Sequence, residues 1–311
     1  MRLAVLGRSE ILLGAAKRLA DAGHEIVLVG TCRSEAYYKA NEADFEGFAA
    51  KCGADFFLDH RINSADIVAR LKKSGAELGV SWNWMVRIEA EAISAFRHGI
   101  LNVHAGDLPR FRGNACPNWA ILLNEPHIGL CVHRMVPEAI DSGDVLKRKR
   151  LPLHSQTYIG DVYGWLEEAV PDLLVEAASD IASGRASWEV QSEVPGESLR
   201  CYPRRPEDSC IDWQKPADEI VRLVRASSRP FAGAYTTLEG DKRVTIWRAD
   251  QAIAPSPYVA MPGQVLYSDC GNPVVAAGEG AVRLIEIEID GIGSGDTAKV
   301  GVLKSLRNRL I

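Results

Sequence analysis

Residues 2–30 read RLAVLGRSEILLGAAKRLADAGHEIVLVG, and this stretch decides the fold class. The apolar run at 2–6 predicts a buried strand, and the run at 25–30 predicts a second one. Between them the pattern is helical, with Ser9 as the expected helix cap and Gly23 as its expected end. A strand, a helix and a strand in close succession predict two parallel strands joined by a crossover helix.

The same alternation continues along the chain. Apolar runs at 54–58, 78–82 and 100–104 are separated by helix-like segments at 63–75 and 89–99. Strands that alternate with helices favour an α/β fold with a doubly wound, mostly parallel sheet. Ligands of such sheets bind outside the carboxyl ends of the strands, so the loops that follow these strands are the expected functional site.

The turn after the first strand lacks the glycine fingerprint of dinucleotide-binding enzymes. Residues 6–14 read LGRSEILLG, without the G-x-G-x-x-G spacing that brings a backbone close to a pyrophosphate. The sequence therefore disfavours a nicotinamide-dependent dehydrogenase.

A change of pattern at residues 194–209 divides the chain. This segment, VPGESLRCYPRRPEDS, holds three prolines and mixed charges, which is typical of a linker. We therefore expect a catalytic domain over 1–193 and a smaller domain over 210–311. Beyond the linker, one helix-like segment at 215–228 precedes short, evenly spaced strands, which predict a small β-barrel or sandwich.

Composition narrows the class of protein. The chain has 311 residues, 47% of them hydrophobic, and a formal net charge of −5, which argues against an overall field built to hold nucleic acid. Its seven cysteines form no C-x-x-C pair, which predicts reduced thiols, a cytoplasmic protein and no structural zinc. We expect neither a signal peptide nor a membrane span.

Three polar side chains form the strongest functional signal. Asn102 and His104 lie on the same face of the predicted strand at 100–104, and Asp141 follows in a glycine-containing loop. An amide and an imidazole at a strand end are by themselves compatible with a structural role. Together with a carboxylate they suit acyl transfer to an amine, because the amide can stabilise an oxyanion, the imidazole can carry a proton, and the carboxylate can orient the imidazole or hold a water.

The order of these motifs resembles a known family. Asn-x-His, then LPRFRG at 108–113, then Asp-Ser-Gly-Asp at 141–144 is similar to the folate-dependent formyltransferases, which include the methionyl-tRNA, glycinamide ribonucleotide and sugar N-formyltransferases. Residues 204–236 also resemble the start of the carboxyl-terminal domain shared by the tRNA and sugar-nucleotide enzymes. The resemblance implies a Rossmann-like catalytic domain followed by an OB-like β-barrel.

The resemblance also implies the chemistry of the site. The formyl donor would be 10-formyltetrahydrofolate, and no metal would be needed. Asn102 would be the oxyanion donor, His104 the proton shuttle and Asp141 the orienting carboxylate.

The pterin ring of the folate is expected against two segments, 81–88 (SWNWMVRI) and the loop 136–141. Aromatic and apolar walls with nearby backbone groups suit a flat heteroaromatic ring. The residues assigned to folate binding are Trp82, Trp84, Met85, Val86, Ile88, Val136, Ile140 and Asp144. Trp82, Trp84 and Met85 are equally compatible with the core.

The sequence departs from the family after the histidine. The family commonly has Ser-Leu-Leu-Pro, whereas this chain has Gly106 in place of the serine and Asp107 in place of an apolar residue. Asp107 could receive a substrate ammonium or hydroxyl group, or it could be a turn-forming loop residue. The role of Gly106 stays open.

The acceptor amine is predicted from charge and from resemblance. The tRNA enzymes usually carry a basic insertion at the position of 31–50, but here two basic residues face four acidic ones, and 201–311 holds 14 basic and 14 acidic residues. Because phosphate neutralisation supplies most affinity for nucleic acid, both counts predict that a nucleic acid partner is disfavoured.

Two segments, RGNACPNWAILLNE at 112–125 and VHRMV at 132–136, resemble the formyltransferase domain that acts on UDP-4-amino-4-deoxyarabinose. This resemblance implies a nucleotide-linked amino sugar as the acceptor. Arg110, Arg112 and Arg204 are the candidates for its diphosphate, although each is also compatible with an ordinary surface arginine.

Other functions stay open at this point. The chain could be a methionyl-tRNA formyltransferase, or a hydrolase that releases formate from the folate with the same three residues. A non-catalytic folate-binding or nucleic-acid-binding module does not need the complete polar set. The oligomeric state is also open, a homodimer included.

Overall fold

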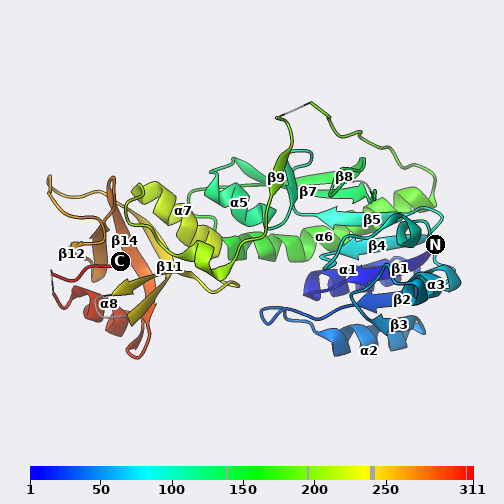
Figure 1. Cartoon of the computed structure of the whole chain (residues 1–311), viewed down its shortest axis with the longest axis horizontal. Helices are drawn as coiled ribbons and strands as arrows, with labels where there is room; N and C mark the ends of the chain where they lie inside the picture. The colour runs from blue at the N-terminus through cyan, green and yellow to red at the C-terminus, as the bar shows by residue number, and fades with distance from the viewer. Residues whose placement is uncertain (138, 195, 239–241, 306) are drawn as a thin grey trace. The chain divides into compact units, whose positions relative to one another are not determined.

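The computed structural model describes residues 1–137, 139–194, 196–238, 242–305 and 307–311 (Figure 1). Its internal contacts define two compact units. Unit 1 comprises Met1–Cys116, His127–Pro152 and Tyr163–Tyr202, and unit 2 comprises Pro117–Pro126, Leu153–Val162 and Pro203–Ile311. The units are interleaved in sequence, because two short segments before residue 163 belong to unit 2. The domain boundaries expected at 193 and 210 stay predictions.

Unit 1 is built on a single large sheet. Its strands are β1 (Arg2–Gly7), β2 (Glu25–Thr31), β3 (Asp55–Leu58), β4 (Leu78–Trp82), β5 (Ile100–His104), β7 (His127–Arg134) and β8 (Val145–Pro152). The seven strands lie in the order β3-β2-β1-β4-β5-β7-β8. The first five are parallel, and β7 and β8 are antiparallel. The predicted doubly wound, mostly parallel sheet is confirmed.

Helices α1 (Glu10–Asp21), α2 (Glu42–Cys52), α3 (Ala65–Lys73) and α4 (Ala90–Ile93) lie within unit 1. α6 (Ile159–Ala182) begins in unit 2 and continues in unit 1, and α5 (Cys116–Leu122) belongs to unit 2 except for Cys116. The apolar positions of α1 are buried at helical spacing, as in Ile11, Leu12 and Leu19. Ser9 does not cap α1 as expected. Its backbone has φ 80°, and its buried Oγ has no hydrogen-bond partner.

A short two-stranded sheet pairs segments that are far apart in sequence. β6 (Phe111–Gly113) runs parallel to β9 (Leu199–Cys201). β9 falls inside the stretch 194–209 that was expected to be only a linker. Gly113 makes this pairing possible, because a Cβ there would collide with the carbonyl oxygen of Cys201.

Unit 2 is an antiparallel sheet domain. Its strands are β10 (Ala234–Leu238), β11 (Lys242–Ala252), β12 (Val265–Asp269), β13 (Asn272–Ala276), β14 (Ala281–Ile289) and β15 (Gly293–Ser294), with the 3-10 helix η1 (Pro206–Ser209) and the helices α7 (Ala217–Ser227) and α8 (Asp296–Leu303). The main path is β10-β11-β14-β13-β12. The last residues pair with both outer strands of this order. Leu310 pairs with Leu238 in β10, and Arg309 pairs with Gln264, which directly precedes β12. This closure fits the predicted small barrel.

The core of unit 2 includes Trp213, Val224, Ile246 and Leu284, which come from the segment before α7, from α7 itself and from two strands. No helix in the described part of the chain is both long enough and apolar enough to cross a membrane.

Candidate active site

The structure brings Asn102, His104 and Asp141 together at the carboxyl end of β5. Asn102 Nδ2 lies 3.4 Å from Asp141 Oδ1, and His104 Nδ1 lies 3.5 Å from Asp141 Oδ2. The side chain of Asp141 is only 11% exposed. The spacing of two places Asn102 and His104 on the same face of β5, and the loop between β7 and β8 delivers the carboxylate.

Backbone and amide groups hold Asp141 in place. Its φ of 53° is in the left-handed region. The Gly113 N–H donates to Asp141 Oδ2 at 2.8 Å. Gln191 Nε2 donates to the carbonyl oxygens of Asp141 at 2.8 Å and of Gly143 at 2.7 Å. Gln191 was missed by the sequence analysis, because nothing in its local pattern places it beside a loop fifty residues earlier.

The side chains of Asp141 and His104 are both largely buried, and the charge of each favours the charged form of the other. Burial alone would raise the pKa of Asp141, but the neighbouring His104 and His133 and the hydrogen bond from the Gly113 N–H together hold that pKa well below its usual range. Burial lowers the pKa of His104, while the charge of Asp141 acts in the opposite direction. The ionised carboxylate of Asp141 therefore stabilises an imidazolium of His104 at this buried position.

The ring of His104 has a defined orientation. Its Nε2 lies 2.5 Å from the carbonyl oxygen of Phe111, so Nε2 carries the proton in this contact and Nδ1 faces Asp141. A second proton, taken up on Nδ1, would face the carboxylate. The pair can therefore accept a proton and hold it as an imidazolium.

His133 is a fourth polar residue of this site, and the sequence analysis did not assign it. It lies directly opposite Asn102 in the β5–β7 ladder and is 2% exposed. Asn102 Nδ2 donates to His133 Nε2 at 3.1 Å, while His133 Nδ1 donates to the carbonyl oxygen of Arg134 at 2.9 Å. His133 Nε2 is also 3.4 Å from Asp141 Oδ1. The hydrogen bond to His133 orients the Asn102 amide, and its second N–H faces Asp141 Oδ1 at the longer distance of 3.4 Å, a contact that a substrate oxygen can replace.

Gly106 lies against His104. A Cβ at this position would collide with both the Phe111 carbonyl oxygen and His104 Nε2. The glycine that replaces the family's serine is therefore what allows the contact between His104 and Phe111.

Asp107 is held by cations of this chain. Its carboxylate contacts Arg148 Nη1 at 2.6 Å, His127 Nε2 at 2.8 Å and Arg150 Nη2 at 3.2 Å. Burial opposes the charge, but these hydrogen bonds lower the pKa of Asp107 overall. A Cβ at Gly129 would collide with the backbone of Asp107. The carboxylate thus connects the loop after β5 to β7 and β8, and a contact with substrate stays a prediction.

The residues assigned to folate binding fall into three groups by exposure. Trp82 and Ile88 are buried, Trp84, Val136 and Asp144 are half-buried, and Met85, Val86 and Ile140 are exposed. Trp84 packs edge-on against Phe57, and its buried Nε1 has no hydrogen-bond partner. An unused donor beside the exposed apolar surface of Met85 and Val86 fits a heteroaromatic ring with acceptor atoms. Residue 138 of the loop 136–141 lies outside the described residues.

The three arginines assigned to a diphosphate have neighbours within the protein. Arg110 lies over the ring of Phe111 at 5.3 Å, and Arg112 donates to Gln191 Oε1 at 2.7 Å. Arg204 belongs to unit 2, where it donates to the Asp208 carbonyl oxygen at 2.9 Å and reaches Ser227 Oγ at 3.2 Å. A phosphate contact for any of them stays a prediction.

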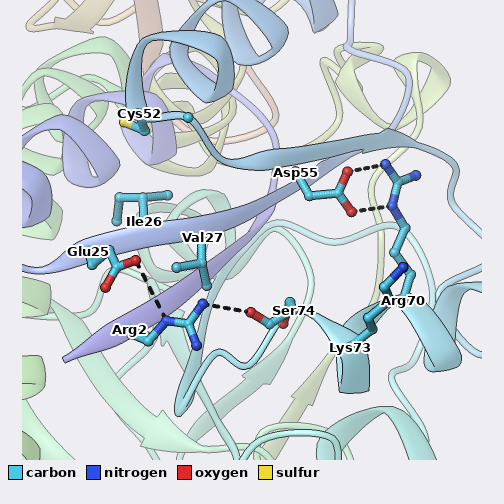
Figure 2. A pocket seen from close by; sticks show the side chains of 10 residues that line it. Arg2, Glu25, Ile26, Val27, Cys52, Asp55, Arg70, Lys73 and Ser74 are labelled. Atoms are coloured by element: carbon cyan, nitrogen blue, oxygen red, sulfur yellow. Dashed lines mark hydrogen bonds and ion pairs between the residues drawn. The ribbon is translucent and has the colours of Figure 1, made fainter.

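A hollow of about 590 Å³ lies elsewhere, at the amino ends of β1, β2 and β3 (Figure 2). Four of its charged groups form two ion pairs. Arg2 contacts Glu25 at 3.6 Å, and Arg70 contacts Asp55 at 2.5 Å. Ligands of doubly wound sheets bind at the opposite edge, so this hollow does not compete with the site on β5. Within the described ranges, no three or more His, Cys, Asp or Glu side chains are grouped to hold a metal ion.

Comparison with protein families identifies the class of protein that this fold and site define. Residues 1–178 match the formyl transferase family, and residues 204–293 match the formyl transferase C-terminal domain. The chain belongs to the formyl transferase family. It is a folate-dependent formyltransferase, with 10-formyltetrahydrofolate as the formyl donor.

The similar curated proteins carry a particular name. Methionyl-tRNA formyltransferase of Symbiobacterium thermophilum is 30% identical over 94% of this chain and 89% of its own length. That of Agathobacter rectalis is 27% identical over 96% of this chain and 94% of its own length.

Solved structures share the fold. HypX from Aquifex aeolicus in complex with tetrahydrofolic acid has a TM-score of 0.61 at 20% identity and covers 97% of this chain and 47% of its own. An N-formyltransferase from Helicobacter canadensis, in complex with folinic acid and dTDP-3-aminofucose, has a TM-score of 0.64 at 13% identity, covering 91% of this chain and 98% of its own.

These relatives correct two predictions. The nucleotide-linked amino sugar as acceptor was wrong, and so was the exclusion of a nucleic acid partner, because relatives over nearly the full length are methionyl-tRNA formyltransferases. The sugar enzymes are similar in structure only, at low identity.

The charge count misled because a sum over a segment does not show where its charges lie. Glu35 is paired with Arg8, and Glu42 accepts from the Ser34 N–H at 2.7 Å. In unit 2, Asp250 and Asp269 both bind Arg283. A formal sum over a segment does not report the local arrangement of charge that meets a phosphate backbone.

Proposed function

We propose that this protein transfers the formyl group of 10-formyltetrahydrofolate to the amino group of methionyl-tRNA. The observation that carries this proposal is the extent of the similarity. Methionyl-tRNA formyltransferases match 94% to 96% of this chain, so the likeness extends over both units and not only over the part that contains β5.

The mechanism we propose assigns one task to each polar residue. The bound folate supplies the formyl group. Asn102 donates an N–H to the formyl oxygen as negative charge develops on it. His104 takes the proton from the attacking amine and returns it to the departing nitrogen, and Asp141 stabilises the imidazolium between these steps. His133 keeps the Asn102 amide in the orientation that this requires.

The folate site in this proposal lies on the segment 81–88 and the loop from Val136 to Asp141. Met85, Val86 and Ile140 would cover the ring, and Trp84 Nε1 would donate to it. Folate binding would remove the exposed apolar surfaces of Met85, Val86 and Ile140 from water, and this burial would favour binding.

A direct assay tests the acceptor. Purified protein is incubated with 10-formyltetrahydrofolate and either methionyl-tRNA, uncharged tRNA or free methionine. We expect formylmethionyl-tRNA from the first and no formylated product from the other two. Release of formate at the same rate with and without methionyl-tRNA, and no formylated tRNA, would identify a hydrolase and reject the proposal.

A further inference from the structure

Gln191 is a buried polar residue to which the proposed mechanism assigns no task. It is 6% exposed and lies in unit 1, in the irregular segment between α6 and β9. This segment is fixed to the start of β8, because Glu189 and Val145 exchange two backbone hydrogen bonds of 2.8 Å. The backbone two residues before the glutamine is therefore held in place.

Both ends of the Gln191 amide are engaged. Its Nε2 donates to the carbonyl oxygens of Asp141 at 2.8 Å and of Gly143 at 2.7 Å. Its Oε1 accepts from Arg112, from Nη2 at 2.7 Å and from Nε at 3.1 Å. A rotated amide would place its oxygen against two carbonyl oxygens and its NH₂ group against a guanidinium. The neighbours of this amide therefore permit one orientation.

The two carbonyls that Gln191 binds belong to the turn that carries the Asp141 carboxylate. Asp141 has a φ of 53°, a left-handed conformation that a residue other than glycine keeps only where its surroundings impose it. A Cβ at Gly143 would collide with the carbonyl oxygen of Arg134, so the turn also packs closely against the end of β7. By bridging residues 141 and 143, the amide opposes a change in the backbone angles of this turn.

Arg112 lies between two residues of β6 that contact the site directly. The Phe111 carbonyl oxygen accepts from His104 Nε2, and the Gly113 N–H donates to Asp141 Oδ2. The guanidinium of Arg112 adds an indirect contact through the glutamine amide. This short strand therefore fixes both the imidazole and the carboxylate.

We propose that Gln191, oriented by Arg112, is a positioning residue that holds the Asp141 carboxylate at His104 during formyl transfer. Gln191 acts only through Asp141 and contacts no reacting atom. Arg112, a candidate for the diphosphate of an acceptor by sequence, then serves the turn and not a phosphate. The inference rests on the proposed function in that the reaction uses His104 and Asp141, but it does not depend on which amine accepts the formyl group.

Gln191→Met is the most direct variant. Methionine has a similar length and no charge, but it cannot donate to the two carbonyl oxygens. The carboxylate of Asp141 should then leave its place beside His104, and kcat should fall by about tenfold to a hundredfold. Gln251→Met, the same substitution at an exposed position of β11, is the control and should leave kcat unchanged.

A double-mutant cycle shows whether Gln191 acts through Asp141. In a chain that already carries Asp141→Asn the carboxylate is absent, so adding Gln191→Met should lower kcat by no more than about twofold. All four proteins are compared at equal concentrations of folded chain, measured by circular dichroism. Equal losses of kcat with and without the Asp141 carboxylate would show a general structural effect and would overturn the proposal.

Titration of His104 by NMR tests the same step without an acceptor. The charge of Asp141 opposes the lowering of the His104 pKa by burial, whereas His133 and Arg200, which also act on this ring, are unchanged in the variant. We therefore expect His104 to titrate at lower pH in Gln191→Met than in the wild type. An unchanged His104 pKa overturns the positioning role. A lowered pKa in a protein that does not formylate methionyl-tRNA keeps this role and rejects the acceptor alone.

Arg112→Met leaves the glutamine in place and tests its orientation separately. We expect kcat to fall by about threefold to tenfold with little change in the KM for the acceptor, and no further loss when Gln191→Met is added. This variant also decides the question if Gln191→Met does not fold. A higher KM for the acceptor at an unchanged kcat would identify a substrate contact of Arg112 and overturn its part in the proposal.

Discussion

At the scale of single residues, the site depends on one buried carboxylate. Asp141 accepts hydrogen bonds from Asn102 and from the Gly113 N–H, and it faces both histidines. Each contact favours the ionised form, which is why the carboxylate stays charged although burial opposes it. The proton affinity of His104 is then set by the balance between this charge and its own burial.

Replacing Asp141 by Asn should lower the pKa of His104 further. Burial already places that pKa below its ordinary value of 6.5, and the Asp141 charge is the opposing influence that the variant removes. We expect the His104 ring, followed by NMR, to titrate below pH 6.5 in the wild type and lower still in the variant. Formyl transfer should fall by about a hundredfold or more. Asp172→Asn, on the exposed side of α6, is the control and should change neither quantity.

The lowered pKa of His104 also affects the stability of the fold. A folded-state pKa of His104 below its unfolded value means that the unfolded chain binds the proton more tightly, so this residue lowers stability as the pH falls below 6.5. In the variant the decrease should be larger between pH 6.5 and about 5, above the range in which the wild type also loses the contribution of the ionised Asp141, measured as the free energy of unfolding in urea at several pH values. An unchanged slope between pH 7 and the acid limb would contradict this account of His104.

Gly106 gives a second prediction at this scale. Gly106→Ser restores the residue common in the family, but its Cβ collides with His104 Nε2 and the Phe111 carbonyl oxygen. We expect a drop in kcat of about tenfold to a hundredfold, because the imidazole is displaced from its place beside Asp141. Gly47→Ala is the matched control, since a Cβ there meets nothing within 4 Å and the residue is in a helix. That control should be neutral or slightly stabilising.

At the scale of elements, the loop after β5 is joined to β7 and β8 by Asp107 and its cations. Arg148 contacts both the Asp107 carboxylate and the Leu108 carbonyl oxygen, at 2.6 and 2.7 Å. Glycine at position 129 lets the loop approach β7 closely. These contacts keep the loop that carries Gly106 at a fixed distance from the strands.

Asp107→Ala should destabilise unit 1, because it leaves the half-buried guanidinium of Arg148 without its main partner. The expected cost is about 2 kcal/mol of unfolding free energy, less than for a fully buried pair since Arg150 keeps solvent contact. The lowered pKa of Asp107 means that its contribution is present at neutral pH and is lost as the pH falls through the folded-state pKa, below 3.8. Thermal melts of wild type and variant should therefore converge in acid. A kcat effect without any change in Tm would instead indicate a substrate contact.

At the scale of the whole molecule, the proposed acceptor makes the reaction sensitive to salt. A tRNA is held largely through its phosphates, and each phosphate contact releases counterions on binding. We expect KM for methionyl-tRNA to rise by about tenfold or more between low and moderate salt, a range over which a few phosphate contacts are strongly weakened. The KM for 10-formyltetrahydrofolate should change much less and serves as the internal control. Equal salt dependence of both constants would argue against phosphate recognition.

Local patterns in the sequence predicted a large part of this protein. The alternation of apolar runs and helical segments predicted the mostly parallel sheet. Strands buried on both faces are continuous apolar runs, and helices buried on one face have apolar residues at helical spacing. The spacing of two put Asn102 and His104 on one side of β5, and the order of motifs identified the family. Local charge counts failed for the acceptor, since they could not show which carboxylates are already paired.

The tertiary structure alone decided which distant residues complete the site. His133 meets Asn102 only through the register of an antiparallel pair, and Gln191 reaches the Asp141 loop from a segment without a local signal. The sequence by itself determined the sheet, the family and the central polar residues, because these follow from short-range periodicity and motif order. Strand register and long-range pairing are set by packing of the whole chain, which no local pattern records.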